Sequence, residues 1–467
     1  MKRVACMERE KLTGYTDMRA QTTGKCIYIL LMGASLLSYI YSLAFALGID
    51  TLPAWLWILR LVSAGMAVWL GKLWKDRGFI LLAAYTCLFF LRVFIEDAGA
   101  IFSAELSENL LSAIWLFGGC YGLGRILNRN ELKKFLFVIA AIWSVAMTIY
   151  SCTGIHTAWT DNYIQVQSGY FGYLDNRLNM IYFPTISGAI LNFSGLFAMI
   201  CFFSVRNKAG KVCFLMTTVL LIIAMAFTNT RTAYITFSLG VGYMAFILVY
   251  RKSEKGKKRK EWLSWAKGIA CMLAVFAVLL FAIMQITPTF NRIKQQRGFL
   301  PVAQAEERET TESVVIATRD FTQVDLLTGR PTIWGDVMRH IGKDPMLLLT
   351  GESKIQPVRK VELTRWKSTL AHCHNILIQV LLESGIPGVL FVLSFMIYTV
   401  VHVFRVARNT SLPLWISLMP AIIVAIWVGD LVETFSWLRS GQCVMAVSLF
   451  IACGIVNQEK RVRLTNQ

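Results

Sequence analysis

Long apolar stretches alternate with short polar ones along almost the whole chain. Apolar runs of 17 or more residues recur, and a run of that length can cross a hydrocarbon layer of about 30 Å. Backbone groups in lipid must find their partners within the chain, so such runs have to be helices. The pattern predicts an all-α polytopic membrane protein with about twelve transmembrane helices. We expect these at about 27–48, 53–70, 79–95, 109–124, 135–155, 180–204, 212–228, 232–250, 268–287, 375–403, 412–429 and 441–457.

One polar interval is far longer than the others and divides the chain. It covers residues 288–374, between the ninth and tenth expected helices. The predicted organisation is a polar segment at 1–26, helices one to nine in 27–287, this loop domain, helices ten to twelve in 375–457, and a tail at 458–467. The first apolar run is long, follows a charged segment and lacks a clear small-residue cleavage site, so we interpret it as a retained helix and not as a signal peptide.

Two pieces of the long loop carry patterns of their own. The segment Glu312–Thr318 contains a Val-Val-Ile run that favours a strand. The segment Pro331–Ile341 is typical of a helix, because Trp334, Val337, Met338 and Ile341 share one face at helical spacing and proline suits a first helical position. We therefore expect a small folded domain that caps the helices.

Composition and charge further limit the class of protein and the partners that it can have. Hydrophobic residues make up 56% of the chain, which excludes a soluble protein, and the net charge is +19. The cations gather in alternate loops, at 72–77, 125–134, 206–211 and 251–260, and in both terminal segments. This is the positive-inside pattern, which predicts cytoplasmic termini and places the long loop outside the cytoplasm. It also argues against nucleic acid as the partner of these charges and favours the lipid bilayer.

The sequence predicts neither a metal site nor a bound cofactor. The eleven cysteines form no CxxC pair and no cysteine–histidine metal spacing, and most of them lie inside expected helices. The outward-facing loops show no Asp-x-Asp motif or paired carboxylates.

The candidate catalytic residues lie where the long loop joins the tenth expected helix. His374 lies at this boundary, with His372 two residues before it. Glu383 follows nine residues later, about two and a half turns on, so it should point away from His374. A charge inside a membrane helix usually faces the protein interior, and we expect Glu383 to form a structural ion pair, with Arg60 or Arg92 as candidates.

Two further outer segments allow a structural and a functional interpretation. The loop 156–177 is rich in aromatic residues, which suits either an interfacial belt or a surface for sugar rings. Arg231 closes the short outer loop Thr228–Arg231, against the positive-inside bias. It is expected to bind either outer-leaflet phosphate or a substrate anion.

These residues resemble the signature of the O-antigen ligase and polymerase superfamily. The pattern is His374-Asn375, nine residues, Gly385, two residues, Gly388. Gly329-Arg330, Trp334 and the segment 345–351 are similar to the preceding loop block of that family. The step Thr230-Arg231 and, more weakly, the segment 172–176 also resemble family features, as does the layout of twelve helices with one large outer loop.

The resemblance implies a glycosyltransferase of the bacterial cytoplasmic membrane that needs no metal. It would move a glycan from an undecaprenyl-pyrophosphate carrier to a hydroxyl of a glycan, lipid or protein acceptor. It implies that His374 is the catalytic base and that Arg231 and Arg330 bind the pyrophosphate. His372, Arg177 and Glu383 are possible secondary residues.

Four functions are compatible with a membrane protein of this kind. Polymerisation of surface polysaccharide repeat units is the favoured reaction, and ligation to a lipopolysaccharide core is the alternative within the family. A repeat-unit transporter is the alternative from another class, but the chain shows no internal repeat, and the loop 206–211 is short where such carriers have a long one. A metal-dependent lipid-phosphosugar transferase would require carboxylates in the first outer loop, which offers only Asp50.

Overall fold

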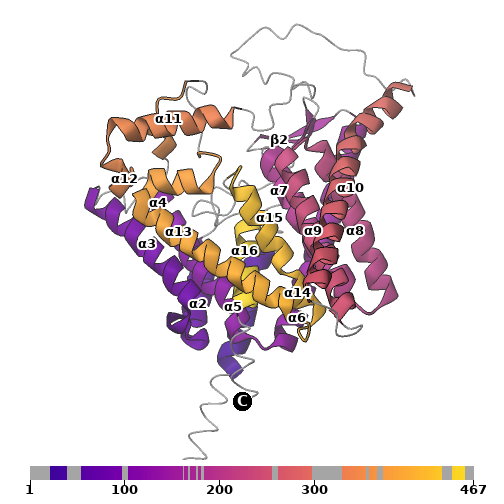
Figure 1. Ribbon diagram of the computed structural model, residues 1–467, viewed down its shortest axis with the longest axis horizontal. Helices are drawn as coiled ribbons and strands as arrows, with labels where there is room; N and C mark the ends of the chain where they lie inside the picture. Colours follow the sequence, from indigo (N-terminus) through magenta and orange to yellow (C-terminus); the bar gives the residue numbers. More distant parts are fainter. Residues whose placement is uncertain are drawn as a thin grey trace, which may run out of the picture.

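The computed structural model describes residues 22–38, 54–96, 104–160, 162–166, 169–174, 177–179, 184–254, 261–296, 329–353, 357–364, 372–433 and 444–457. Helices dominate these ranges (Figure 1). Within them, seven helices are long and apolar enough to cross a membrane: α3 (Arg77–Glu96), α6 (Arg129–Thr160), α7 (Pro184–Ser204), α8 (Lys208–Phe227), α9 (Arg231–Glu254), α10 (Glu261–Gln296) and α13 (Ile376–Arg408). The chain is therefore a polytopic membrane protein.

Shorter apolar helices occupy the other expected positions. They are Thr22–Ser38, α2 (Ala54–Gly71), the pair α14 (Leu414–Leu418) and α15 (Pro420–Asp430), and α16 (Val444–Asn457). The fourth expected helix is irregular, because α4 (Ala104–Ile114) and α5 (Tyr121–Ile126) are joined by a π-helical segment, Trp115–Cys120. The count of twelve membrane crossings stays a prediction.

The described helices form two groups with a pair between them (Figure 1). Helices α7 to α10 pack together in one group, and α3 packs along α13 in the other. Helices α15 and α16 lie between the groups and contact both. This central position of α15 matters for the site, because its outer end faces the beginning of α13.

The tenth expected helix is broken. Gly385 has a left-handed, non-helical backbone (φ 64°, ψ −167°), so α13 consists of two segments that meet at a kink. Figure 1 shows that the first segment and the longer second segment run in different directions. The break comes two residues after Glu383, so Glu383 lies at the end of the first segment.

The long loop contains a small helical domain on top of α13. Helix α11 (Arg330–Lys343), helix α12 (Leu347–Thr350) and a 3₁₀ turn, Pro357–Lys360, share a core with the first segment of α13. The expected helix is confirmed, but its apolar face is rotated: Ile333, Val337 and Ile341 are buried while Met338 is 49% exposed. The predicted strand 312–318 lies outside the described residues.

Two boundaries of the outer segments differ from expectation. Helix α10 continues through Pro288 to Gln296, beyond the expected start of the loop. The aromatic loop forms an antiparallel sheet of strands β1 (Tyr163–Val166), β2 (Gly169–Leu174) and β3 (Arg177–Asn179), which adds a small β element to the all-α fold. Tyr173 packs edge-on against Phe227, with ring centroids 6.1 Å apart, so this aromatic ring belongs to the packing of the sheet on the bundle.

Candidate functional site

Three side chains from distant parts of the chain meet at one end of the bundle. Nδ1 of His374 lies 2.7 Å from Oε2 of Glu433. A guanidinium nitrogen of Arg330 contacts the other carboxylate oxygen of Glu433. Glu433 is buried, and His374 and Arg330 are partly exposed, with side-chain exposures of 22% and 13%. The carboxylate thus lies behind the two cationic or basic groups, which remain accessible.

The start of α13 holds His374 in place. Asn375 is the N-cap of this helix, and its side-chain oxygen accepts hydrogen bonds from the backbone N–H groups of Leu377 (2.9 Å) and Ile378 (3.1 Å). Its amide nitrogen donates to the carbonyl of Leu431 (2.8 Å), just before Glu433. The same asparagine therefore starts the histidine helix and ties it to the segment that carries the carboxylate.

The residues around His374 limit its freedom further. The indole of Trp334 donates to the carbonyl of Cys373 (3.0 Å), and the N–H of Cys373 donates to the side chain of Gln379 (2.8 Å). His374 itself has a left-handed backbone, with φ 54°. This conformation is uncommon for residues other than glycine and needs support from its surroundings, which these bonds supply.

Arg330 is the first residue of α11. Gly329 before it has φ 77°, a conformation that glycine adopts without steric cost, and Pro331 follows in the first turn. The positive end of the helix dipole adds to the charge of the guanidinium near Glu433. The motif residues Gly329 and Arg330 therefore have separate roles, one in turning the chain and one in supplying charge.

These neighbours control the ionisation of Glu433. Burial alone would raise the pKa of this carboxyl group, but the hydrogen bond and charge of His374 and the charge of Arg330 together lower its pKa from 4.5 to about 2. Glu433 is therefore an anion at neutral pH. An anionic partner at Nδ1 favours the tautomer of His374 that keeps its hydrogen on Nδ1 and leaves a lone pair on Nε2.

His372 lies against this group. Its ring centroid is 4.2 Å from that of His374, in an edge-on arrangement. Its Nδ1 accepts a hydrogen bond from the backbone N–H of His374 (3.3 Å). Each of His372, His374 and Glu433 offers one possible metal-ligand atom, and these three atoms lie within 4.8 Å of one another. The sequence predicts no metal site, whereas the folded structure brings together three side chains that could hold a metal ion.

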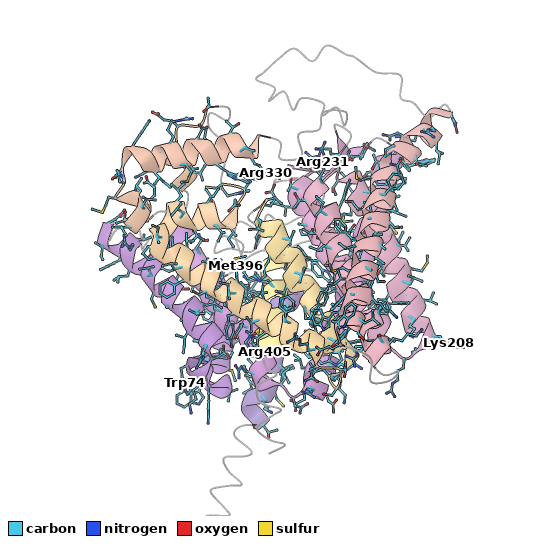
Figure 2. The ribbon with its side chains drawn as sticks, viewed as in Figure 1. Trp74, Lys208, Arg231, Arg330, Met396 and Arg405 are labelled. Carbon is cyan, nitrogen blue, oxygen red and sulfur yellow. The ribbon has the colours of Figure 1, made fainter. Side chains whose placement is uncertain are left out.

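Arg231 and Arg177 lie at the turn between α8 and α9, at the same end of the bundle as Arg330. Thr228–Arg231 form a tight turn between α8 and α9, in which Asn229 has φ 50°. Nε of Arg177 donates to the carbonyl of Thr228 (3.2 Å), so Arg177 braces this turn. Figure 2 shows Arg231 and Arg330 at the same end of the bundle. That both arginines reach one pyrophosphate stays a prediction.

Glu383 lies away from His374, as the helical spacing predicted. Its carboxylate accepts a hydrogen bond from Gln379 (2.6 Å) and one from the hydroxyl of Tyr85 (3.5 Å). Arg60, one of the two expected ion-pair partners, lies over the rings of Trp57 and Trp115, with its guanidinium carbon 5.0 and 4.6 Å from their centroids. Glu383 therefore supports the kink of α13 and does not orient His374.

Glu433 is the site residue that the sequence analysis missed. It follows the apolar run at 412–429, in a short interval that the charge pattern predicts to lie outside the cytoplasm. A carboxylate at the outer end of a membrane helix was the available signal, but no motif joins it to His374. The contact spans 59 positions along the chain and becomes visible only in the folded structure.

Residues 216–393 match the family model described as O-antigen ligase. The match runs from within α8 to the second segment of α13, and it includes Arg231, Arg330 and His374. Arg177 and Glu433 lie outside it. No curated protein was found to be similar to the chain.

Proposed function

We propose that His374, Glu433 and Arg330 form the catalytic centre of a membrane glycosyltransferase, which the match of residues 216–393 to the O-antigen ligase family supports. The reaction is transfer of a glycan from an undecaprenyl-pyrophosphate carrier to an acceptor hydroxyl. The observation that carries this proposal is the contact between Nδ1 of His374 and the buried Glu433, at 2.7 Å. It leaves Nε2 of the histidine as the basic nitrogen.

The chemistry follows from this tautomer. Nε2 of His374 removes the proton of the acceptor hydroxyl as its oxygen attacks the anomeric carbon of the donor sugar. The new glycosidic bond forms while the bond from that carbon to the pyrophosphate oxygen breaks. The carrier pyrophosphate leaves with the electron pair, and Glu433 stabilises the imidazolium that has formed, as a buried carboxylate does behind other catalytic histidines.

Charge on the leaving group requires cationic partners. Arginine suits pyrophosphate because its planar guanidinium can form two parallel hydrogen bonds. Arg330 has one nitrogen on Glu433, which fixes the side chain beside the base. Arg231, from the turn before α9, is the proposed second cation, and Arg177 supports that turn.

The charge pattern supports a location for this chemistry. The site lies at the end of the bundle that carries the loop domain, opposite the labelled basic residues Lys208 and Arg405 (Figure 2). Since cations favour the cytoplasmic side, we place the site at the outer face of the bacterial cytoplasmic membrane and both termini in the cytoplasm. The isoprenoid chain of the donor would then remain in the lipid bilayer.

The decisive experiment removes the base. His374→Ala should reduce transfer from a lipid-pyrophosphate-linked glycan by about 10²–10⁴-fold, the usual contribution of general-base catalysis. The exposed His156, at the outer end of α6, provides a matched control, and His156→Ala should keep full activity. Both purified variants are assayed by gel electrophoresis of the glycan product. Full activity of His374→Ala at normal abundance would contradict the proposed role.

Two acceptors deserve comparison in that assay. We favour a second lipid-linked repeat unit, which makes the chain a polymerase of surface polysaccharide. The description of the matching family as O-antigen ligase supports a lipopolysaccharide core as the other candidate. A polymerase would give a ladder of products from lipid-linked units alone. A ligase would give a product only when the core lipid is added.

A further inference from the structure

The proposed catalytic centre also carries the donor set of a metal site. His372, His374 and Glu433 each offer one ligand atom, and the three atoms lie within 4.8 Å of one another. Two imidazole nitrogens and one carboxylate oxygen form a set that zinc uses in sites with an open fourth position. Of the three residues only His374 belongs to the sequence motif, and His372 and Glu433 lie outside it.

The distances between the ligand atoms are close to those of a zinc site. In a tetrahedral site with bonds of 2.0–2.1 Å, ligand atoms lie roughly 3.3 Å apart. The pair formed by His374 and Glu433 is closer than this, at 2.7 Å, and has to open slightly. His372 has to approach, and both histidines are only partly buried, so their rings can turn. One ring nitrogen of His372 completes the set.

We propose that these three residues form an inhibitory zinc site. During transfer, Nδ1 of His374 carries a hydrogen that it donates to Glu433, and Nε2 has the free lone pair. Zinc bound between the two side chains takes the lone pair of Nδ1, so the hydrogen moves to Nε2. A protonated Nε2 cannot accept the proton of the acceptor hydroxyl. Zinc thus converts the base to its inactive tautomer, and no proton leaves the ring.

Arg330 limits the strength of this binding. Its guanidinium contacts the carboxylate oxygen of Glu433 that does not face His374, and its positive charge opposes a second cation nearby. Structural zinc sites bind with about 10–16 kcal/mol at neutral pH. The site described here should bind more weakly, with reversible inhibition at micromolar zinc.

The inhibition rests on the proposed role of His374, whereas zinc binding itself does not. Two measurements on the full-length protein in detergent separate them. Equilibrium dialysis against buffered zinc, followed by elemental analysis, gives the bound metal. The transfer assay, run from EDTA to micromolar zinc, gives the inhibition. Each variant is compared with its own rate in EDTA, so differences in basal activity do not enter.

Wild type and His156→Ala should each bind one zinc ion at this site. The transfer rate of each should fall more than about tenfold in micromolar zinc relative to its rate in EDTA. His372→Ala should bind zinc at least about tenfold more weakly, because even the loss of a residue that only supports a metal ligand costs 10–100-fold in affinity. Its inhibition should shift to higher zinc by the same factor. EDTA should leave the wild-type rate intact or raise it.

Three results would overturn the zinc site. They are an unchanged wild-type rate at micromolar zinc, a rate that rises with zinc, and equal zinc inhibition of wild type and His372→Ala. A protein that shows no transfer in EDTA would instead contradict the proposed function, and its dialysis result would still test whether the three residues bind zinc.

Discussion

Glu433 connects the two motif residues of the site. It accepts from His374 at one oxygen and contacts Arg330 at the other. Glu433→Gln removes the negative charge but keeps the size of the side chain. Replacing the carboxylate behind a catalytic histidine with an amide lowers kcat by about 10⁴ in a well-studied protease, so we expect a loss of at least about a hundredfold here.

The kinetic constants of Glu433→Gln and the activity of Glu433→Asp distinguish a role in positioning His374 from a role in folding. The loss in Glu433→Gln should fall mainly on kcat, because the proposed substrate contact of Arg231 is unaffected. Glu433→Asp should recover part of the rate, since it restores the charge at a slightly longer distance. Equal activity of Glu433→Gln and wild type would show that the carboxylate does not support the base.

The low pKa of Glu433 also predicts a dependence of stability on pH. The pKa is lowered from 4.5 to about 2 in the folded protein. The ionised carboxylate therefore stabilises the fold above about pH 4.5, and this contribution disappears as the pH falls toward 2. The Tm of wild type should exceed that of Glu433→Gln at neutral pH, and the difference should shrink at about pH 3. A constant difference at both pH values would contradict this assignment.

At the scale of single residues, motifs identified part of the site. His374 and Arg330 stand in recognisable patterns, so the sequence pointed to both of them. Glu433 stands in none, because its role arises from the packing of α15 beside the start of α13. Glu383 is the reverse case: its charge predicted an ion pair, whereas its hydrogen-bond partners include Gln379 and Tyr85 and it lies beside the kink.

At the scale of elements, the kink of α13 explains two glycines. Gly385 and Gly351 both have φ 64°. A Cβ on Gly385 would lie 2.6 Å from the backbone carbon of Leu349, and one on Gly351 would lie 2.4 Å from that of Glu383. The N–H groups of Glu352 and Ser353 donate to carbonyls at the end of the first segment of α13, at 2.7 and 3.1 Å. The loop thus satisfies the carbonyl groups that the break exposes.

Gly385→Ala should therefore destabilise the outer domain and misplace His374. The region around φ 64°, ψ −167° is almost confined to glycine and costs another residue about 1–3 kcal/mol, and the backbone contact adds to this cost. Gly335 offers a matched control, because it lies in α11 with nothing within 4 Å of an added Cβ, and Gly335→Ala should slightly stabilise the helix. The measurements are Tm in detergent and the transfer rate. Equal Tm values for the two variants would contradict the proposed role of the kink.

Hydropathy predicted the elements better than it predicted their interruptions. Apolar length identifies a helix in lipid because the backbone has no other way to satisfy its polar groups. It says nothing about where neighbouring segments press on the backbone, so it missed the break at Gly385 and the π-helical segment at Trp115–Cys120. The sheet at 163–179 was missed because the aromatic residues of that loop were interpreted by their chemistry alone.

At the scale of the whole molecule, the distribution of charge predicts the orientation in the membrane. Lys343 lies at the end of α11 in the loop domain, and Lys208 lies at the start of α8 at the opposite end of the bundle; both are exposed. On a background without native cysteines, Lys343→Cys should react in intact cells with a thiol probe that cannot cross membranes. Lys208→Cys should react only after the membrane is opened, and the reverse pattern would contradict the positive-inside assignment.

The chain order of the three site residues has a consequence for biosynthesis. Arg330 and His374 are translated before α15, and Glu433 follows that helix. A nascent chain therefore contains the arginine 103 positions and the histidine 59 positions before their shared carboxylate. Until the ribosome has passed α15, the histidine has neither its anionic partner nor the asparagine contact to Leu431. Insertion of one late helix is thus the step that completes the proposed centre, and a chain cut before it would span the membrane without this centre assembled.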